Sequence, residues 1–227
     1  MKKKLMVAAL CVSMAAGALT ACGSGASSTA TQAAATQAAT ETKAAEGAAE
    51  TKAAEGAAEA AETAELPAGI AEGPILLTSD GQSADVNVVQ TLLKKCEIES
   101  DLNATASADD LSGYKTLVLA IGGSSKGLGA AGIDENQELE RVNSLIAKAK
   151  EEGITIIALH IGGSARRGTL SDKFVPDALK AANAAIIVSE GDSDGMMKGI
   201  VTDGNIPTAF VDNQVGAIEP LKTLFGK

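Results

Sequence analysis

Residues 116–161 read TLVLAIGGSSKGLGAAGIDENQELERVNSLIAKAKEEGITIIALHI, and this stretch indicates the class of fold. Its two ends, 116–121 and 154–161, are uninterrupted apolar runs of strand length. Between them, Asp134 followed three residues later by Gln137 predicts the start of a helix. The inner face of that helix is predicted to carry Leu139, Val142, Leu145, Ile146 and Ala149. Strands that are apolar throughout and alternate with helices predict a parallel sheet covered on both faces.

The flanking sequence continues this alternation. Further strands are predicted at 75–78, 97–102 (a short edge strand), 185–188 and 207–211. Further helices are predicted at 86–96, 171–182, 194–203 and 218–225. We therefore expect one α/β domain over residues 73–227, a three-layer, doubly wound parallel sheet of Rossmann-like or flavodoxin-like type. Such sheets bind ligands at the carboxyl ends of their strands.

Two of the loops predicted at those carboxyl ends share a pattern. Residues 121–124 and 161–164 both read Ile-Gly-Gly-Ser, and cations and a further glycine follow each. Glycines allow backbone amides to turn toward a ligand, while hydroxyls and cations complement an anion. The residues predicted to bind such a ligand are Ser124, Ser125, Lys126, His160, Ser164, Arg166, Arg167 and Asp172. The alternative left open is that these are structural glycines and solvated loop charges.

Other motifs in these loops are weaker. Residues 127–132, GLGAAG, match the dinucleotide pattern GxGxxG, but the motif starts five residues after the strand and the helix is expected only after Gly132. Residues 191–195 match GxSxG between a strand and a helix, so a hydrolase that uses His160 with Ser193 or a nearby acid such as Asp172 is the alternative function. No His/Cys cluster has metal-ligand spacing, the loop at 79–83 fits FMN poorly, and no cofactor is predicted.

Three segments carry a family resemblance: 122–129 (GGSSKGLG), 166–168 (RRG) and 171–173 (SDK). With these segments, residues 73–227 resemble a family of bacterial exported domains, often lipoproteins, that has no assigned activity. The resemblance implies an exported protein and supplies no substrate.

The amino terminus indicates where the protein works. Three lysines at positions 2–4 precede an uncharged apolar run, Leu5–Leu19, which is too short to span a membrane as a helix. The run ends in Leu19-Thr20-Ala21-Cys22, which resembles the signal peptide and lipobox of bacterial lipoproteins. The resemblance implies that residues 1–21 are removed, that Cys22 carries a diacylglyceryl group, and that the protein sits on the extracytoplasmic face of the cell membrane. Two acyl chains give stable anchoring.

Residues 22–72 separate this anchor from the domain. They consist largely of Ala, Thr, Glu, Gln, Gly, Ser and Lys, and TKAAEGAAE at 42–50 is repeated at 51–59. A segment with so few large apolar residues cannot form a core, so we expect a disordered tether.

The composition excludes some functions. The chain has 19 Lys and Arg against 29 Asp and Glu, a net charge of −10, which argues against nucleic-acid binding. With no Trp, one Tyr and three Phe, stacking of bases or sugars is also disfavoured. We therefore expect a membrane-anchored lipoprotein that binds a small anionic ligand or a protein partner, of undetermined oligomeric state.

Overall fold

The computed structural model describes residues 65–227. The predicted signal peptide, the lipid-bearing Cys22 and most of the predicted tether lie outside the described residues.

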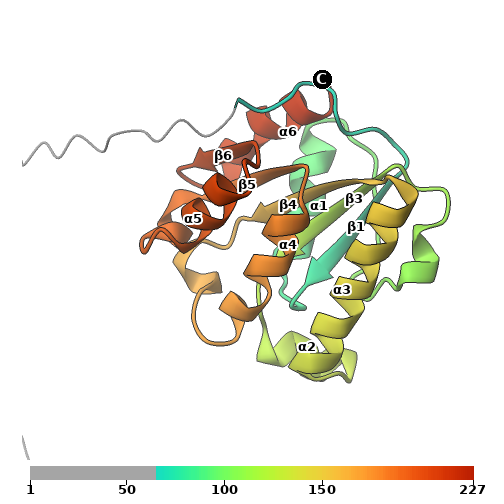
Figure 1. The fold of residues 1–227 in the computed structure, drawn as a ribbon, viewed down its shortest axis with the longest axis vertical. Helices are drawn as coiled ribbons and strands as arrows, with labels where there is room; N and C mark the ends of the chain where they lie inside the picture. Colours follow the sequence, from blue (N-terminus) through green and yellow to red (C-terminus); the bar gives the residue numbers. More distant parts are fainter. Residues whose placement is uncertain (1–64) are drawn as a thin grey trace, which may run out of the picture. The chain divides into compact units, whose positions relative to one another are not determined.

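The described chain contains one six-stranded sheet in which every neighbouring pair of strands is parallel. The strand order is β2-β1-β3-β4-β5-β6, and the α/β prediction is confirmed (Figure 1). The strands are β1 (Ile75–Asp80), β2 (Asp101–Leu102), β3 (Thr116–Ile121), β4 (Thr155–His160), β5 (Ala184–Val188) and β6 (Thr208–Val211).

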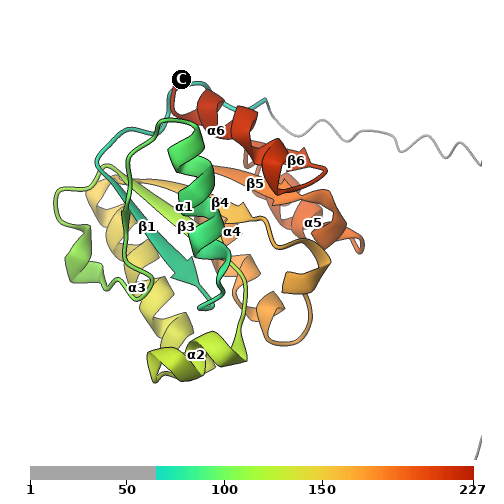
Figure 2. The ribbon, with the colours of Figure 1, turned by 180° about the vertical axis from the view of Figure 1, so that it is seen from behind.

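Helices cover both faces of this sheet. One face carries α3 (Glu135–Glu152), α4 (Val175–Ala181) and α5 (Met196–Asp203). The other carries α1 (Asp85–Lys95) and α6 (Ile218–Leu224), as Figures 1 and 2 show from opposite sides. The short helix α2 (Ser125–Ala131) lies beyond the carboxyl end of β3. Alternate residues of each central strand enter one of two apolar cores, and every residue of β3 is buried, which explains the uninterrupted apolar runs.

The helix predicted from Asp134 is confirmed as α3. The Asp134 carboxylate accepts hydrogen bonds from the amides of Asn136 and Gln137, and the Gln137 side chain accepts one from the Asp134 amide. These bonds satisfy amides that the first turn of a helix leaves free. Gly153 ends the helix in the left-handed conformation.

Two predicted elements differ from the structure. The edge strand expected over 97–102 is reduced to Asp101–Leu102, because Glu97 adopts φ +57° and the Ile98 amide donates back to the Leu93 carbonyl to close α1. The helix expected over 171–182 is split into a 3-10 turn at Ser171–Lys173 and α4. Pro176 has no N–H and its ring would clash with an earlier helical carbonyl, so it lies in the first turn of a new helix.

Packing begins ahead of the predicted domain boundary at residue 73. Leu66 and Ile70 pack against the core beneath α1 and α6. The amides of Gly69 and Ala71 donate to carbonyls of Thr223 and Leu224 at the end of α6. The last residues of the predicted tether, from Leu66 onward, are therefore part of the folded domain, and they join it beside α6, where Figure 1 also shows the C-terminus. Within residues 65–227, no helix combines the length and the apolar character that are needed to cross a membrane.

Candidate functional site

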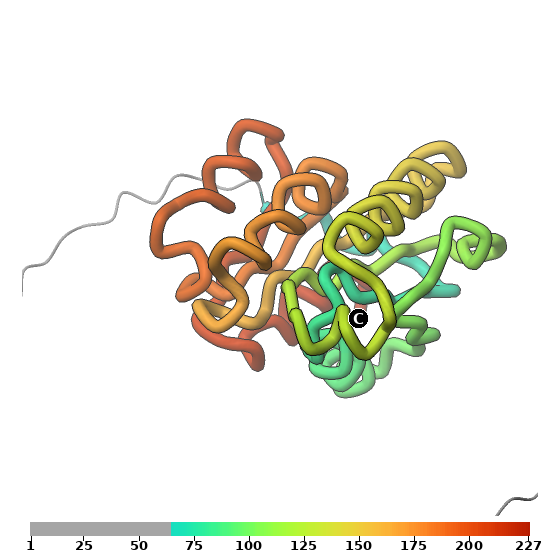
Figure 3. The backbone as a smooth tube through the Cα atoms, turned by 90° about the horizontal axis from the view of Figure 1, so that it is seen from below, coloured from blue at the N-terminus to red at the C-terminus, as the bar shows by residue number. Residues whose placement is uncertain are grey.

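The strand order indicates that a ligand site is to be sought at the carboxyl ends of β1 and β3. The chain moves from β1 outward to β2 and then returns to β3 on the other side of β1, so the order reverses between β1 and β3. In open α/β sheets the crevice at this reversal, beyond the carboxyl ends, is the usual ligand site. Figure 3 looks onto this end of the sheet and shows α2 beside the loops that follow the strands.

An open depression of about 550 Å³ lies at this position. It is bordered by the turn after β1, the start of α1, α2 and the loop after β2, through these residues: Gln82, Ser83, Ala84, Val86, Asn87, Ala104, Ser124, Lys126, Gly127, Ala130 and Ala131. A smaller hollow of about 280 Å³ lies at the opposite pole, where the exposed Lys115–Glu72 ion pair occupies its rim. The β1/β3 depression is therefore the hollow whose position fits a ligand site on this fold.

The walls of the β1/β3 depression are built from two closely packed loops. Gln82 adopts φ +58° and forms an isolated antiparallel bridge with Gly123. A side chain on Gly127 would overlap the Gln82 carbonyl, so only glycine fits at that point of α2. The Ser124 hydroxyl accepts a hydrogen bond from the Gly127 amide at 3.1 Å and caps α2. The glycine and serine in this loop therefore have clear packing roles.

A buried ion pair on α3 fixes the turn that follows β1. Glu138 of α3 is fully buried and pairs with Arg141 at 2.7 Å. Its carboxylate also accepts hydrogen bonds from the Gly81 amide (2.9 Å) and from the Gln82 side chain (3.1 Å). Arg141 donates further to the Ser79 carbonyl at 2.5 Å. Helix α3 thus fixes the end of β1 and the turn that follows it.

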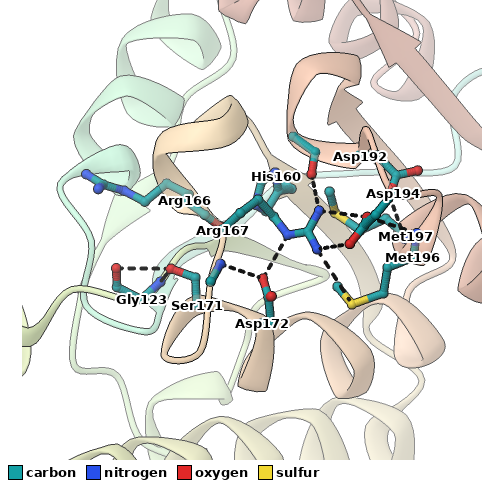
Figure 4. Close-up of polar contacts among 12 residues, drawn as sticks. Gly123, His160, Arg166, Arg167, Ser171, Asp172, Asp192, Asp194, Met196 and Met197 are labelled. Carbon is teal, nitrogen blue, oxygen red and sulfur yellow. Dashed lines mark hydrogen bonds and ion pairs between the residues drawn. The ribbon is translucent and has the colours of Figure 1, made fainter.

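The two arginines that follow the second Ile-Gly-Gly-Ser motif point in opposite directions (Figure 4). Arg166 runs toward α1, where its Nε donates to Asp85 at 2.8 Å. A Cβ on Gly162 would overlap the Arg166 side chain, and one on Gly122 would lie 3.0 Å from its Cδ. The first glycine of each motif therefore leaves room for Arg166.

Arg167 is held by carboxylates on the other side. It pairs with Asp172 at 2.7 Å and with Asp194 at 2.8 Å, and it donates to the Gly191 carbonyl. The hydrogen bonds with Arg167 lower the pKa of Asp194 to about 2. Arg167 therefore ties the loop after β4 to the loop after β5, and its charge is already balanced.

His160 is buried at the end of β4. Its Nε2 lies 3.0 Å from the Arg166 carbonyl oxygen, which can only accept, so the neutral ring donates from Nε2. Burial lowers the pKa of His160 and favours this neutral form. Its Nδ1 has no partner within residues 65–227. Asp172 bonds to Arg167 and to the Gly168 amide instead, and Ser193 is exposed. The structure therefore does not assemble the alternative triad of His160, Asp172 and Ser193.

Comparison with protein-family models matches residues 72–225 to a domain of unknown function, DUF6305. The chain belongs to the DUF6305 family. Separate comparisons with curated proteins and with solved structures find no significant match. The DUF6305 match spans the whole sheet and both glycine-rich loops.

The predicted binding residues of the DUF6305 domain are divided among three places. Ser124 and Lys126 line the β1/β3 depression, and Ser125 is exposed at the start of α2. Ser164 donates to Glu190 at 2.7 Å, away from that depression. The remaining four form the paired network around the loop after β4: His160, Arg166, Arg167 and Asp172. Lys126, Arg166 and Arg167 therefore do not meet in one pocket.

The dinucleotide motif is placed differently from the prediction. Residues 127–131 lie within α2, whereas the sequence predicted a helix only after Gly132. The Ser124 cap starts an additional short helix ahead of the predicted one, α3. Gly127 and Gly129 are therefore helical rather than part of the turn that would cradle a pyrophosphate, and Gly132 ends α2 in the left-handed conformation. Within residues 65–227, acidic, histidine and cysteine side chains form no group of three that could hold a metal ion.

Sequence reasoning missed the buried polar cluster of Asp80, Glu138 and Arg141. The signal was available for Glu138, which falls on the same helical face as Val142, Leu145 and Ala149. For Asp80 the signal was its position two residues after the predicted strand 75–78, since β1 extends to Asp80 and all six of its residues are buried.

Proposed function

We propose that this chain is a lipoprotein anchored through Cys22 on the extracytoplasmic face of the bacterial membrane, whose α/β domain binds a small anionic ligand in the β1/β3 depression. The anchor rests on the basic start, the short apolar run and the Leu19-Thr20-Ala21-Cys22 sequence. The ligand site rests on the position and the lining of the depression.

The observation that carries the binding proposal is the charge of that lining. Among the described residues around the depression, Lys126 is the single charged side chain, although the chain as a whole carries −10. Lys126 is exposed and takes part in no ion pair with the rest of residues 65–227. An unpaired cation in a lining that contains no acid attracts an anion, and its ammonium group supplies up to three donors.

The rest of the lining narrows the class of ligand. Val86, Ala84, Ala130 and Ala131 give part of the surface an apolar character, while Ser83 and Asn87 add polar groups. A volume of about 550 Å³ is within the range of small-molecule sites. One cation beside an apolar wall suits a monoanion with a short aliphatic part, such as a short-chain carboxylate, better than a multiply charged phosphate.

Arg166 borders this site without being free for it. Arg166 and Ser83, which lines the depression, both lie close to Gly122. A Cβ added to Gly122 would be 3.0 Å from the Cδ of Arg166 and 3.0 Å from the hydroxyl oxygen of Ser83. The guanidinium is shared with Asp85, so a bound anion would compete with that carboxylate. We therefore assign the principal charge contact to Lys126.

A binding screen on the purified protein tests this assignment. Short-chain carboxylates and inorganic phosphate are titrated by calorimetry and by their effect on the melting temperature. Lys126→Ala should weaken carboxylate binding about tenfold, which corresponds to about 1.4 kcal/mol. Lys180→Ala, an exposed lysine on α4, is the matched control and should bind like the unmodified protein. If no anion binds, the binding proposal fails; if both variants bind equally well, the site lies elsewhere.

The anchor is tested separately in cells. Labelled palmitate should enter the unmodified protein and should not enter Cys22→Ser, which should also leave the membrane fraction. Incorporation into the Cys22→Ser protein would overturn the assignment of the anchor to this residue.

A further inference from the structure

Asp80 stands out among the described ionisable groups. It ends β1 directly before the turn at Gly81–Ser83, and the residue is 1% exposed. Neither of its carboxyl oxygens has a hydrogen-bond partner within residues 65–227. A buried carboxylate without a counterion or donor is strongly unfavourable. The neutral acid avoids most of that cost.

The one cation nearby is already committed. Arg141 uses its Nε and Nη2 on the Glu138 carboxylate, and its remaining N–H groups on the Ser79 and Ala106 carbonyls and the Thr78 hydroxyl. These five bonds match the five donors of a guanidinium. Arg141 and Glu138 therefore form a neutral pair that leaves no donor for Asp80.

The charged groups that face Asp80 reinforce this. Glu138 and Arg141 act on it from α3, and the exposed Asp177 of α4 has the smallest influence. Burial, followed by the charge of Glu138, raises the pKa of Asp80 well above its usual range, and Arg141 offsets this only in part. The direction agrees with the geometry, because a carboxylate that is buried and has no donor is destabilised as an anion.

We propose that Asp80 is a proton-binding site built into the domain: it is kept as the neutral acid in the folded protein, and its ionisation loosens the Gly81–Ser83 turn that walls the β1/β3 depression. The coupling passes through Glu138, whose carboxylate holds the Gly81 amide and the Gln82 side chain. Repulsion from an ionised Asp80 pushes on the same carboxylate. This inference does not depend on the identity of a ligand.

The sign of the pH dependence follows from linkage. The folded protein keeps the Asp80 proton in a range where the unfolded chain, with an ordinary carboxyl near pH 4, has released it. Stability from this group is therefore full below about pH 4 and declines as the pH rises toward the folded-state pKa. Over that window the unfolding equilibrium constant increases tenfold per pH unit relative to a chain without the group.

Asp80→Asn is the decisive variant because it keeps the shape and cannot ionise. Urea denaturation from pH 4 to pH 9 gives the unfolding equilibrium constant of each protein, and the constant of the unmodified protein is divided by that of Asp80→Asn. This ratio should rise about tenfold per unit from about pH 4 upward and then level off. A ratio that stays constant across this range would overturn the proposal.

Infrared spectroscopy provides a measurement that does not require the variant to fold. When the pH is raised from about 5, where ordinary carboxyls are mostly ionised, the unmodified folded protein should still show the carbonyl band of a protonated carboxylic acid, and Asp177→Asn should retain it as the matched control. Absence of the band in the unmodified protein would show that Asp80 is ionised. The amide resonances of Gly81 and Gln82 should shift with the same midpoint as this band; if they do not, the coupling to the turn is wrong.

Discussion

The same four residues, Ile-Gly-Gly-Ser, mark the carboxyl ends of β3 and β4, but the surroundings of the two loops differ. Gly122 and Gly162 leave room for one shared side chain, that of Arg166. Beyond them the loops diverge: Ser124 caps α2 beside an open depression, whereas Ser164 bonds to Glu190 next to a network of paired charges. The first loop retains an unpaired cation, while the second has both cations balanced by carboxylates.

This difference separates a surface that can receive a ligand from one that joins elements of the fold. Identical residues at equivalent strand ends of a parallel sheet do not imply equivalent roles, because the partners come from distant parts of the chain. Asp85 precedes Arg166 by 81 residues, and Asp194 follows Arg167 by 27. Substitutions in each loop should therefore affect different properties.

The largest effect is expected where α2, which continues the loop after β3, packs against the turn after β1. Gly127→Ala would place a Cβ against the Gln82 carbonyl, so backbone must move, and we expect a loss of about 3 kcal/mol or more. Gly129→Ala, two residues along the same helix with no atom within 4 Å of the added Cβ, should instead stabilise by about 0.5–1 kcal/mol. Urea denaturation measures both. Equal and small effects would show that the Gln82–Gly127 contact is not required.

The architecture could be predicted from local sequence because local signals define it. The apolar runs of β3 and β4 and the Asp134–Gln137 cap are contained within a few residues each. The division of labour between the two loops could not be predicted in this way. The sequence displays Lys126, Arg166 and Arg167 as similar loop cations, and only the positions of α1 and of the segments that carry Asp172 and Asp194 show which of them are paired.

The next effect separates the two neighbouring arginines. Arg167→Ala should cost about 2 kcal/mol, because it leaves Asp172 and Asp194 unpaired and frees the Gly191 carbonyl. Arg166→Ala should cost about 1 kcal/mol, because Asp85 lies in the first turn of α1, where the helix dipole still favours a carboxylate.

Urea denaturation of the two arginine variants, with carboxylate affinity measured in parallel, completes this test. Arg167→Ala should leave affinity unchanged, since Arg167 does not line the β1/β3 depression and is bonded to Asp172 and Asp194. A fall in affinity without a loss of stability would make Arg167 a ligand contact after all.

The smallest effect compares the serines that end the two motifs. Ser124→Ala removes the cap of α2 and should cost about 1 kcal/mol. Ser164→Ala removes one exposed hydrogen bond to Glu190 and should stay within about 0.5 kcal/mol. Because α2 also carries Lys126, fraying its first turn should weaken carboxylate binding in Ser124→Ala alone. Paired urea and calorimetric titrations decide the matter: equal losses in both variants would mean that the shared sequence does mark a shared role, and the contrast between the loops would have to be abandoned.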